Sequence, residues 1–203
     1  MADSAPSTSN NRSQAHQQAL EQFVLYWGEM ASSWGINKTM AQIHALLYAD
    51  PEPMDTDTIM MELDISRGNA NMNLRKLLEW GLIHKVNKEG ERREFFIAEK
   101  DVWNMAARII QERQRLEITP IKENLKECLN TMDQERSRIE SERAFRERIE
   151  NFVSFLELFE DFTRALLPYV TQKNLDSLQK FVSFARKRNL LKGRPEDHLP
   201  LKS

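Results

Sequence analysis

The sequence predicts a mainly α-helical protein built around a winged helix-turn-helix, in which a short helix, a tight turn and a second helix precede a two-stranded β-hairpin. Two observations predict this fold class. Apolar residues recur at three- and four-residue steps along most of the chain, and only six glycines and seven prolines interrupt its 203 residues. Two short strand-like segments, IHKV and REFFI, flank a turn at residues 87–91.

Three helices are predicted before the helix that begins at Ser66. The first runs from about Ala15 to Trp34, carries one apolar stripe and ends at Gly35, a suitable C-cap glycine. The second begins after Asn37, a good N-cap, and ends before the Asp50–Pro51 pair. A short third helix, capped by Asp55 or Thr56, carries Ile59, Met60 and Leu63.

The next helix begins at Ser66, an N-cap residue, and ends at Gly81. At about 100° per residue, an inward face forms from Ala70, Leu74, Leu77 and Leu78. Gly68, Asn69, Met72, Arg75, Lys76 and Glu79 then lie on the opposite side, and Arg67, Asn71 and Asn73 lie on the flanks.

The outward residues of this helix have the chemistry of a DNA-reading surface. An Asn amide can pair with an adenine edge, Arg can contact guanine or phosphate, and exposed Met72 suits a thymine methyl. From Ser66 to Arg93 there are seven basic residues and three acidic ones, in a chain whose net charge is −2. The candidate DNA-contacting residues are Ser66, Arg67, Gly68, Asn69, Asn71, Met72, Asn73, Arg75 and Lys76 on the helix, and Lys88, Arg92 and Arg93 at the hairpin. The alternative is a small α/β domain with a solvated basic face.

A family resemblance rests on these same residues. SRGNANMNLRKLLEWGLIHKV followed by KEGERREFF resembles the GbsR-like branch of the MarR-type transcriptional regulators. The resemblance covers roughly Phe23 to Leu129, and its specific parts are the Trp-Gly-Leu after the helix and the Gly-Glu-Arg-Arg turn. It implies a homodimer of winged-helix subunits held by N- and C-terminal helices, in which residues 67–76 read the major groove of double-stranded DNA and residues 88–93 form the wing. For such a regulator we expect repression. Asp64 stands where such turns often carry Gly, and Asp tolerates the left-handed backbone comparatively well.

From Asp101 onward the chain is predicted to be entirely helical, with a kink or restart at Thr119–Pro120. The charge-rich stretch 133–148 is expected to be a solvated helix face. A strongly apolar helix follows from Phe145 to Leu166, and a last helix is expected at about 172–191. The apolar helix needs cover on more than one side, which favours an obligate homodimer.

Composition and motif content argue against other classes of protein. The four histidines show no metal-ligand spacing, and there is no phosphate loop or nucleophile motif, so we expect no catalytic residue, no metal and no cofactor. No apolar run reaches the length of a membrane span, and the single Cys128 indicates a reducing compartment, so we expect a cytoplasmic protein without membrane contact.

Three further hypotheses stay open. The resemblance implies a small-molecule effector, and for a small cation such as choline the candidate aromatic walls are Trp27, Trp34, Trp103 and Phe145, unless these are core or dimer contacts. Cys128 lies on an apolar stripe and is expected to be a buried inert thiol, with redox sensing as the alternative. A helical scaffold that binds no DNA is the third.

Together these expectations divide the chain into five segments. They are a disordered tail at 1–14, an N-terminal dimerisation helix at 15–35, a winged helix-turn-helix DNA-binding domain at 36–98, a helical dimerisation and effector region at 99–192, and a loose tail at 193–203.

Overall fold

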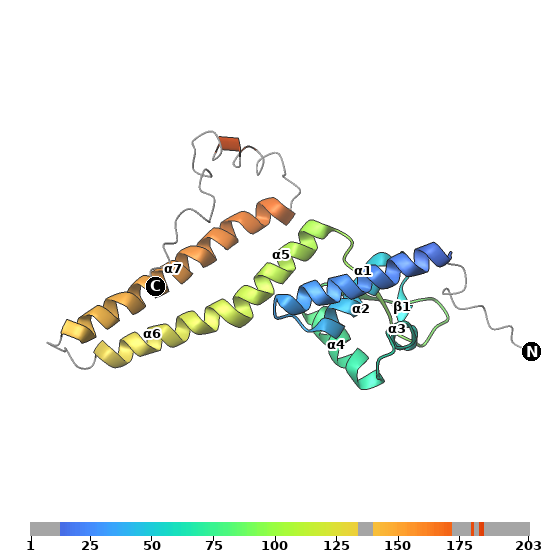
Figure 1. Ribbon diagram of the computed structural model, residues 1–203, viewed down its shortest axis with the longest axis horizontal. Coiled ribbons are helices and arrows are strands. Elements are labelled where there is room, and N and C mark those ends of the chain that lie inside the picture. The colour runs from blue at the N-terminus through green and yellow to red at the C-terminus, as the bar shows by residue number, and fades with distance from the viewer. Residues whose placement is uncertain (1–12, 134–139, 172–179, 181–182, 185–203) are drawn as a thin grey trace, which may run out of the picture. The chain divides into compact units, whose positions relative to one another are not determined.

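A computed structural model of the chain describes residues 13–133, 140–171, 180 and 183–184. The chain divides into two compact units, Met1–Arg108 and Ile109–Ser203 (Figure 1). The predictions of a tail at 1–14 and at 193–203, and of a helix at 172–191, fall wholly or largely outside the described residues. The fold is mainly helical with one small antiparallel sheet, as the sequence predicts.

The first unit begins with two packed helices, α1 (Gln14–Ser33) and α2 (Lys38–Ala49). Ser13 caps α1 by accepting a hydrogen bond from the backbone N–H of His16 at 3.2 Å. The helices approach closely at Gly28, where an added Cβ would lie 2.7 Å from Cγ of Gln42. This glycine therefore lets α1 lie directly against α2.

The helix-turn-helix consists of α3 (Thr56–Leu63) and α4 (Arg67–Glu79). Asp64, between them, adopts the left-handed conformation with φ 51°, so the turn forms with Asp in place of the more usual Gly. The predicted N-caps Asn37 and Ser66 are confirmed, and Asp55 is the N-cap of α3. The largest fully buried apolar side chains of this unit are Ile43, Leu46, Leu47, Ile59, Leu77 and Ile83.

The sheet has the strand order β1-β3-β2, from β1 (Met54–Asp55), β2 (Ile83–Val86) and β3 (Phe95–Ala98). Both neighbouring pairs are antiparallel, with Ile83 opposite Ala98 and Met54 opposite Phe96. The two-stranded wing is as predicted, whereas the two-residue β1 is an addition that the sequence did not indicate. It ties the start of α3 to the wing.

The second unit contains most of a long helical hairpin. Helix α5 (Val102–Arg113) continues through a π-helical segment, η2 (Gln114–Ile118), into α6 (Thr119–Asp133), and α7 (Glu140–Thr171) lies beside α6 (Figure 1). The predicted restart at Thr119–Pro120 coincides with the start of α6, although the interruption before it is a wider helical turn. Among the described helices, none combines the length and apolarity that a membrane span requires.

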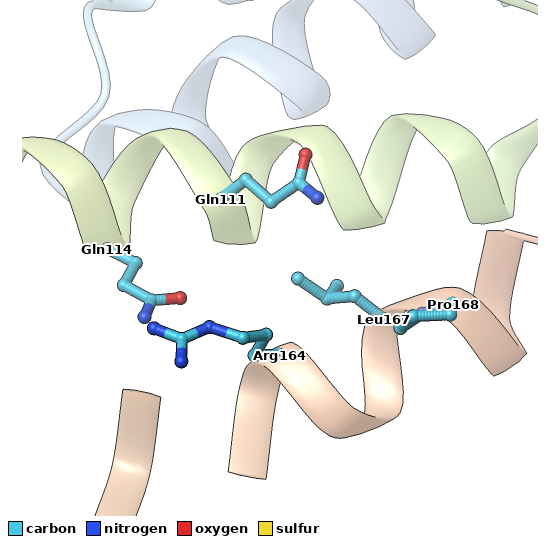
Figure 2. A pocket seen from close by; sticks show the side chains of 5 residues that line it. All are labelled: Gln111, Gln114, Arg164, Leu167 and Pro168. Carbon is cyan, nitrogen blue, oxygen red and sulfur yellow. The ribbon is translucent and has the colours of Figure 1, made fainter. Parts of the chain in front are cut away.

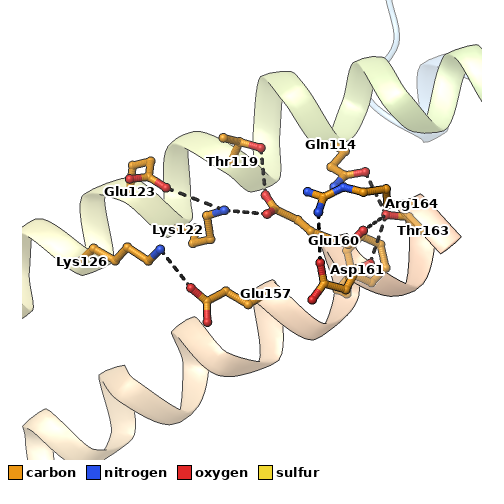
Figure 3. A network of polar contacts seen from close by, with 11 residues as sticks. Gln114, Thr119, Lys122, Glu123, Lys126, Glu157, Glu160, Asp161, Thr163 and Arg164 are labelled. Atoms are coloured by element: carbon orange, nitrogen blue, oxygen red, sulfur yellow. Dashed lines mark hydrogen bonds and ion pairs between the residues drawn. The ribbon is translucent and has the colours of Figure 1, made fainter.

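A polar network joins α6 to α7 (Figure 3). Glu160, only 6% exposed, accepts hydrogen bonds from Lys122 Nζ at 2.5 Å and from the Thr119 hydroxyl at 2.9 Å. The bond from Lys122 is the main reason that the pKa of Glu160 lies below its ordinary value, although burial opposes the shift. Lys126 pairs with Glu157 at 2.9 Å at the surface.

Candidate nucleic-acid interface

Helix α4 is fixed by its buried face and by caps at both ends. Ser66 Oγ accepts a hydrogen bond from the Asn69 N–H at 3.3 Å. At the other end Gly81 has φ +65°, a left-handed conformation in which a residue with a side chain would be strained. Ala70, Leu74 and Leu77 are buried as predicted.

The placement of Asn73 on a flank of α4 is wrong, because the side chain is completely buried. Asn73 comes three residues after Ala70 and four before Leu77, so it belongs to the inward face. Its Nδ2 donates to the backbone oxygen of Asn69 at 2.9 Å and to Asn69 Oδ1 at 2.7 Å. Asn73 therefore cannot contact a base while α4 stays packed, and half-buried Asn69 is partly committed to the same pair.

The remaining outward residues of α4 form a continuous exposed surface. Arg67, Gly68, Asn71, Met72, Arg75 and Lys76 are all exposed, Met72 to 48%. Nothing lies within 4 Å of the position that a Cβ would take at Gly68, so this end of the helix is open. Arg67 pairs with Asp57 of α3, whereas Arg75 and Lys76 have no ion-pair partner among the described residues.

The cations of the wing differ in how they are held. Arg93 forms ion pairs with Asp55 and Glu91, Lys85 pairs with Glu94 at 2.5 Å, and the Lys88 ammonium lies 4.5 Å from the centroid of the Phe95 ring. Arg92 is exposed and has no such partner within the described part of the chain.

Asp55 is the acceptor around which one end of the wing is organised, and the sequence did not identify it as a partner of Arg93. It is 4% exposed and accepts a hydrogen bond from the Thr58 N–H at 2.8 Å as the cap of α3. Burial would raise the pKa of this carboxyl, but the hydrogen bonds with Thr58 and the charges of Arg93 and Lys88 outweigh burial and lower it. Arg93 is thus a restraint of the fold as well as a candidate phosphate contact.

Of the four candidate effector walls, Trp27 has a packing role. Its ring stacks on buried His44 at 6.2 Å between centroids, and His44 stacks on Tyr48 at 6.1 Å. Trp34 is the C-cap of α1, roughly 10 Å along the helix axis from Trp27. Trp34 and Trp103 are exposed in the first unit and Phe145 in the second.

Cys128 is exposed, so the prediction of a buried thiol is wrong for the single chain. The stripe that carries it on α6 faces outward in part, since Ile121, seven residues earlier, is also 47% exposed. No group of three or more His, Cys, Asp or Glu side chains in the described ranges is arranged to hold a metal ion.

No family model matches the sequence, and no curated protein is similar enough to match it. Solved structures do match. One of them, described as "Crystal Structure of a transcriptional regulator", aligns with a TM-score of 0.61 over 76% of this chain and 99% of its own chain, at 20% sequence identity. At this identity the match establishes a shared fold.

Proposed function

We propose that the chain is a sequence-specific DNA-binding transcriptional regulator and that α4 is its reading helix. The observation that carries the proposal is the exposed face of α4. Arg67, Asn71, Met72, Arg75 and Lys76 project from a helix whose opposite face is packed into the core. Such a helix can enter a major groove without unfolding anything beneath it.

The side chains on this face suit base and phosphate contacts. The Asn71 amide offers a donor and an acceptor to an adenine edge, and Arg75 offers two parallel donors to guanine. Met72 gives an apolar contact for a thymine methyl, and Gly68 keeps side-chain atoms away from an approaching DNA backbone. We assign sequence choice to Asn71, Met72 and Arg75, with Asn69 in a lesser role because it is bonded to Asn73.

The wing supplies affinity without sequence choice. Arg92 is free to reach a phosphate, and Lys88 lies beside the turn at Gly90. Arg93 must give up or share its contacts with Asp55 and Glu91 to do the same. We therefore expect Arg92 and Lys88 to contribute more to DNA affinity than Arg93.

The aromatic stripe of α7 supports a homodimer. We define this stripe as Phe152, Phe155, Leu158, Phe159 and Phe162, which are 39% to 69% exposed. At about 100° per residue its centre lies about 120° around the helix from the face that Val153 and Leu156 present to α6. Its exposed area is on the order of 500 Å², more than half of the roughly 800 Å² that each partner contributes to a typical interface.

A second copy of the chain is the occupant that we assign to the stripe. A two-fold dimer would present α4 twice, so we expect it to bind two DNA half-sites about one helical turn apart. We also propose the finer points of the sequence resemblance: membership of the GbsR-like branch of MarR-type regulators, the five-segment division with dimerisation through the N- and C-terminal helices, repression by occupying the operator, and location in the cytoplasm.

The first test is selection of bound fragments from genomic DNA with purified full-length protein. A regulator enriches a symmetric site, protects two half-sites and loses affinity steeply with salt. A helical scaffold would retain no DNA at low or high salt, and that result would overturn the proposal.

The second test assigns the reading residues. Met72→Ala, Arg75→Ala and Asn71→Ala should each reduce discrimination between matched and scrambled duplexes by about 1–3 kcal/mol, with melting temperatures near wild type. Arg148→Ala, an exposed arginine of α7, is the matched control and should bind like wild type. If all three α4 variants keep full discrimination, α4 does not read the sequence.

A further inference from the structure

The second unit contains a pocket of about 410 Å³ that the DNA-reading role does not use (Figure 2). Gln111 and Gln114, three residues apart, line one side from α5 and η2. Arg164, Leu167 and Pro168 line the other side from one face of α7. The volume falls within the range of small-molecule sites, which is roughly 300–1,000 Å³.

Among the described residues that line the pocket, Arg164 is the one that carries a charge. The other polar groups are the carboxamides of Gln111 and Gln114, while Leu167 and Pro168 are apolar. The Arg164 guanidinium pairs through Nη1 with Asp161 at 3.2 Å, and both side chains are more than 70% exposed. An exposed pair of this kind contributes at most about 1 kcal/mol, so an anion inside the pocket can compete for the guanidinium.

The pocket side of Gln114 is held by the buried network between the helices (Figure 3). The Thr163 hydroxyl, 9% exposed, lies 2.9 Å from Gln114 Oε1 and 2.9 Å from the backbone oxygen of Glu160. The backbone oxygen of Phe159 is a third acceptor, at 3.1 Å. When the hydroxyl proton is donated to Gln114 Oε1, the Nε2 donor of the Gln114 amide is left for the pocket. Gln114 also opens the π-helical segment, and such turns are frequent at functional sites.

We propose that this pocket binds a small organic carboxylate with an apolar body. The carboxylate would accept hydrogen bonds from Arg164, with Gln111 and Gln114 as additional polar contacts, and the apolar body would lie on Leu167 and Pro168. A ligand of this pocket would carry a negative charge, whereas the aromatic cage considered from the sequence would bind a positively charged ligand. The proposal concerns binding to the second unit and does not depend on DNA recognition.

The test is ligand-observed NMR on the full chain without DNA, with three probes that each carry a linear alkyl chain of five or six carbons on a different head group: hexanoate, hexanamide and hexyltrimethylammonium. Hexanoate should bind at least about tenfold more tightly than the other two, because only it forms charge-assisted hydrogen bonds with Arg164. Arg164→Gln should weaken hexanoate binding by a similar factor and leave hexanamide unchanged. Arg148→Gln, which removes the same charge from an exposed site on α7, should bind hexanoate like wild type.

Three outcomes would overturn the proposal. They are no binding of hexanoate at millimolar concentration, equal binding of the three probes, or equal loss of hexanoate binding in the Arg164→Gln and Arg148→Gln variants. Thermal melts of both variants check that the hairpin remains folded. Because no DNA is present, failure here leaves the DNA-reading proposal untouched, and failure of DNA binding leaves this result interpretable.

Discussion

The two units differ in how completely each buries its apolar residues. In the first unit, the helices and the sheet share one core, from Leu20 in α1 to Ala107 in α5. In the described part of the second unit, only Val153, Leu156 and Leu167 are buried apolar side chains. The phenylalanine rings of the α7 stripe are exposed, and the centroids of the Phe152 and Phe155 rings are 6.4 Å apart.

The comparison shows that the same helical spacing of apolar residues can produce either a face buried within the chain or a face left exposed. The apolar residues of α2 are covered by neighbours in the same chain, whereas the described residues leave the aromatic stripe of α7 39% to 69% exposed. An exposed apolar patch of this size is at the upper end of what monomeric proteins present. The second unit is therefore the part of the molecule whose stability we expect to depend on protein concentration.

The largest expected effect follows from placing a charge in the stripe. Phe155→Asp should raise the dissociation constant of the homodimer more than about 100-fold, because a second copy would bury an unpaired carboxylate. Sedimentation or light scattering should then find a monomer at micromolar concentration. All four tryptophans, Trp27, Trp34, Trp80 and Trp103, lie in the first unit, so melting followed by their fluorescence should change little.

Ser154→Asp is the control, since it adds the same charge at the neighbouring exposed position outside the stripe. It should remain dimeric. Wild-type protein that is monomeric at micromolar concentration, or a Phe155→Asp variant that is fully dimeric, would contradict the assignment of a second copy to this face.

The second effect concerns a buried histidine in the closed first unit. Burial is the main cause, and the nearby charge of Lys100 the lesser one, that lowers the pKa of His44 to about 4. The unfolded chain takes up a proton near pH 6.5 and the folded chain does not, so stability should fall as the pH drops from about 6.5 to 4, by on the order of 2–3 kcal/mol. Tryptophan-fluorescence melts across this range measure the slope.

His44→Phe should flatten that slope while keeping the stack between Trp27 and Tyr48. The buried Nε2 of His44 has no hydrogen-bond partner among the described residues, so the substitution should cost less than about 1 kcal/mol at pH 7. His84→Phe, at an exposed position of β2, is the control and should keep the wild-type slope. An unchanged slope in His44→Phe would mean that His44 is not the group that titrates.

Local features of the fold were predictable because they depend on neighbours in sequence. The caps at Asn37 and Ser66, the glycine turns and the inward face of α4 each follow from spacing within a few residues. The strand β1 was not predictable, since two residues show no periodicity and Met54–Asp55 pairs with a partner about forty residues away. The exposure of Cys128 also escaped prediction, because a stripe does not reveal whether anything covers it.

The candidate interface was predictable as a surface but not in its internal pairing. Exposure of Met72, Arg75 and Lys76 follows from the helical repeat. Asn73 was misplaced because a polar residue on the inward face looks like a flank residue until its partner Asn69 is seen. The pairing of Arg93 with Asp55 joins residues 38 apart, which spacing along the chain does not reveal.

The third expected effect, in order of size, concerns the ion pair between Arg93 and Asp55. Arg93→Ala should lower the stability of the first unit by about 1 kcal/mol, because it leaves the buried Asp55 carboxylate with less charge compensation, discounted for the 56% exposure of the Arg93 side chain. The lowered pKa of Asp55 means that this contribution is present at neutral pH and is lost as the pH falls below about 4. Chemical denaturation followed by tryptophan fluorescence measures it.

Arg92→Ala is the matched neighbour. It should change stability by less than about 0.5 kcal/mol and weaken binding to matched and scrambled duplexes alike, with a smaller salt slope. If the two variants exchange these properties, so that Arg92 stabilises and Arg93 only binds, the division between held and free cations on the wing is wrong.

The smallest effect concerns the pair between α3 and α4. Asp57 pairs with Arg67 at the start of α4, and both side chains are more than half exposed. A pair of this kind contributes about 0.2–1 kcal/mol, which DNA must displace if Arg67 is to reach a phosphate or a base. Asp57→Asn should therefore raise DNA affinity between about 1.5-fold and fivefold, and the gain should shrink with added salt.

Glu52→Gln separates this local competition from a change in net charge, since it removes one negative charge at an exposed position of the same unit. Titrations of both variants on the selected duplex at two salt concentrations give the comparison. A gain in Asp57→Asn alone supports competition for Arg67, and an equal gain in both reduces the effect to net charge. A loss of DNA affinity in Asp57→Asn would show the opposite role for Asp57. The carboxylate would then position the Arg67 side chain for contact with DNA instead of competing with DNA for it.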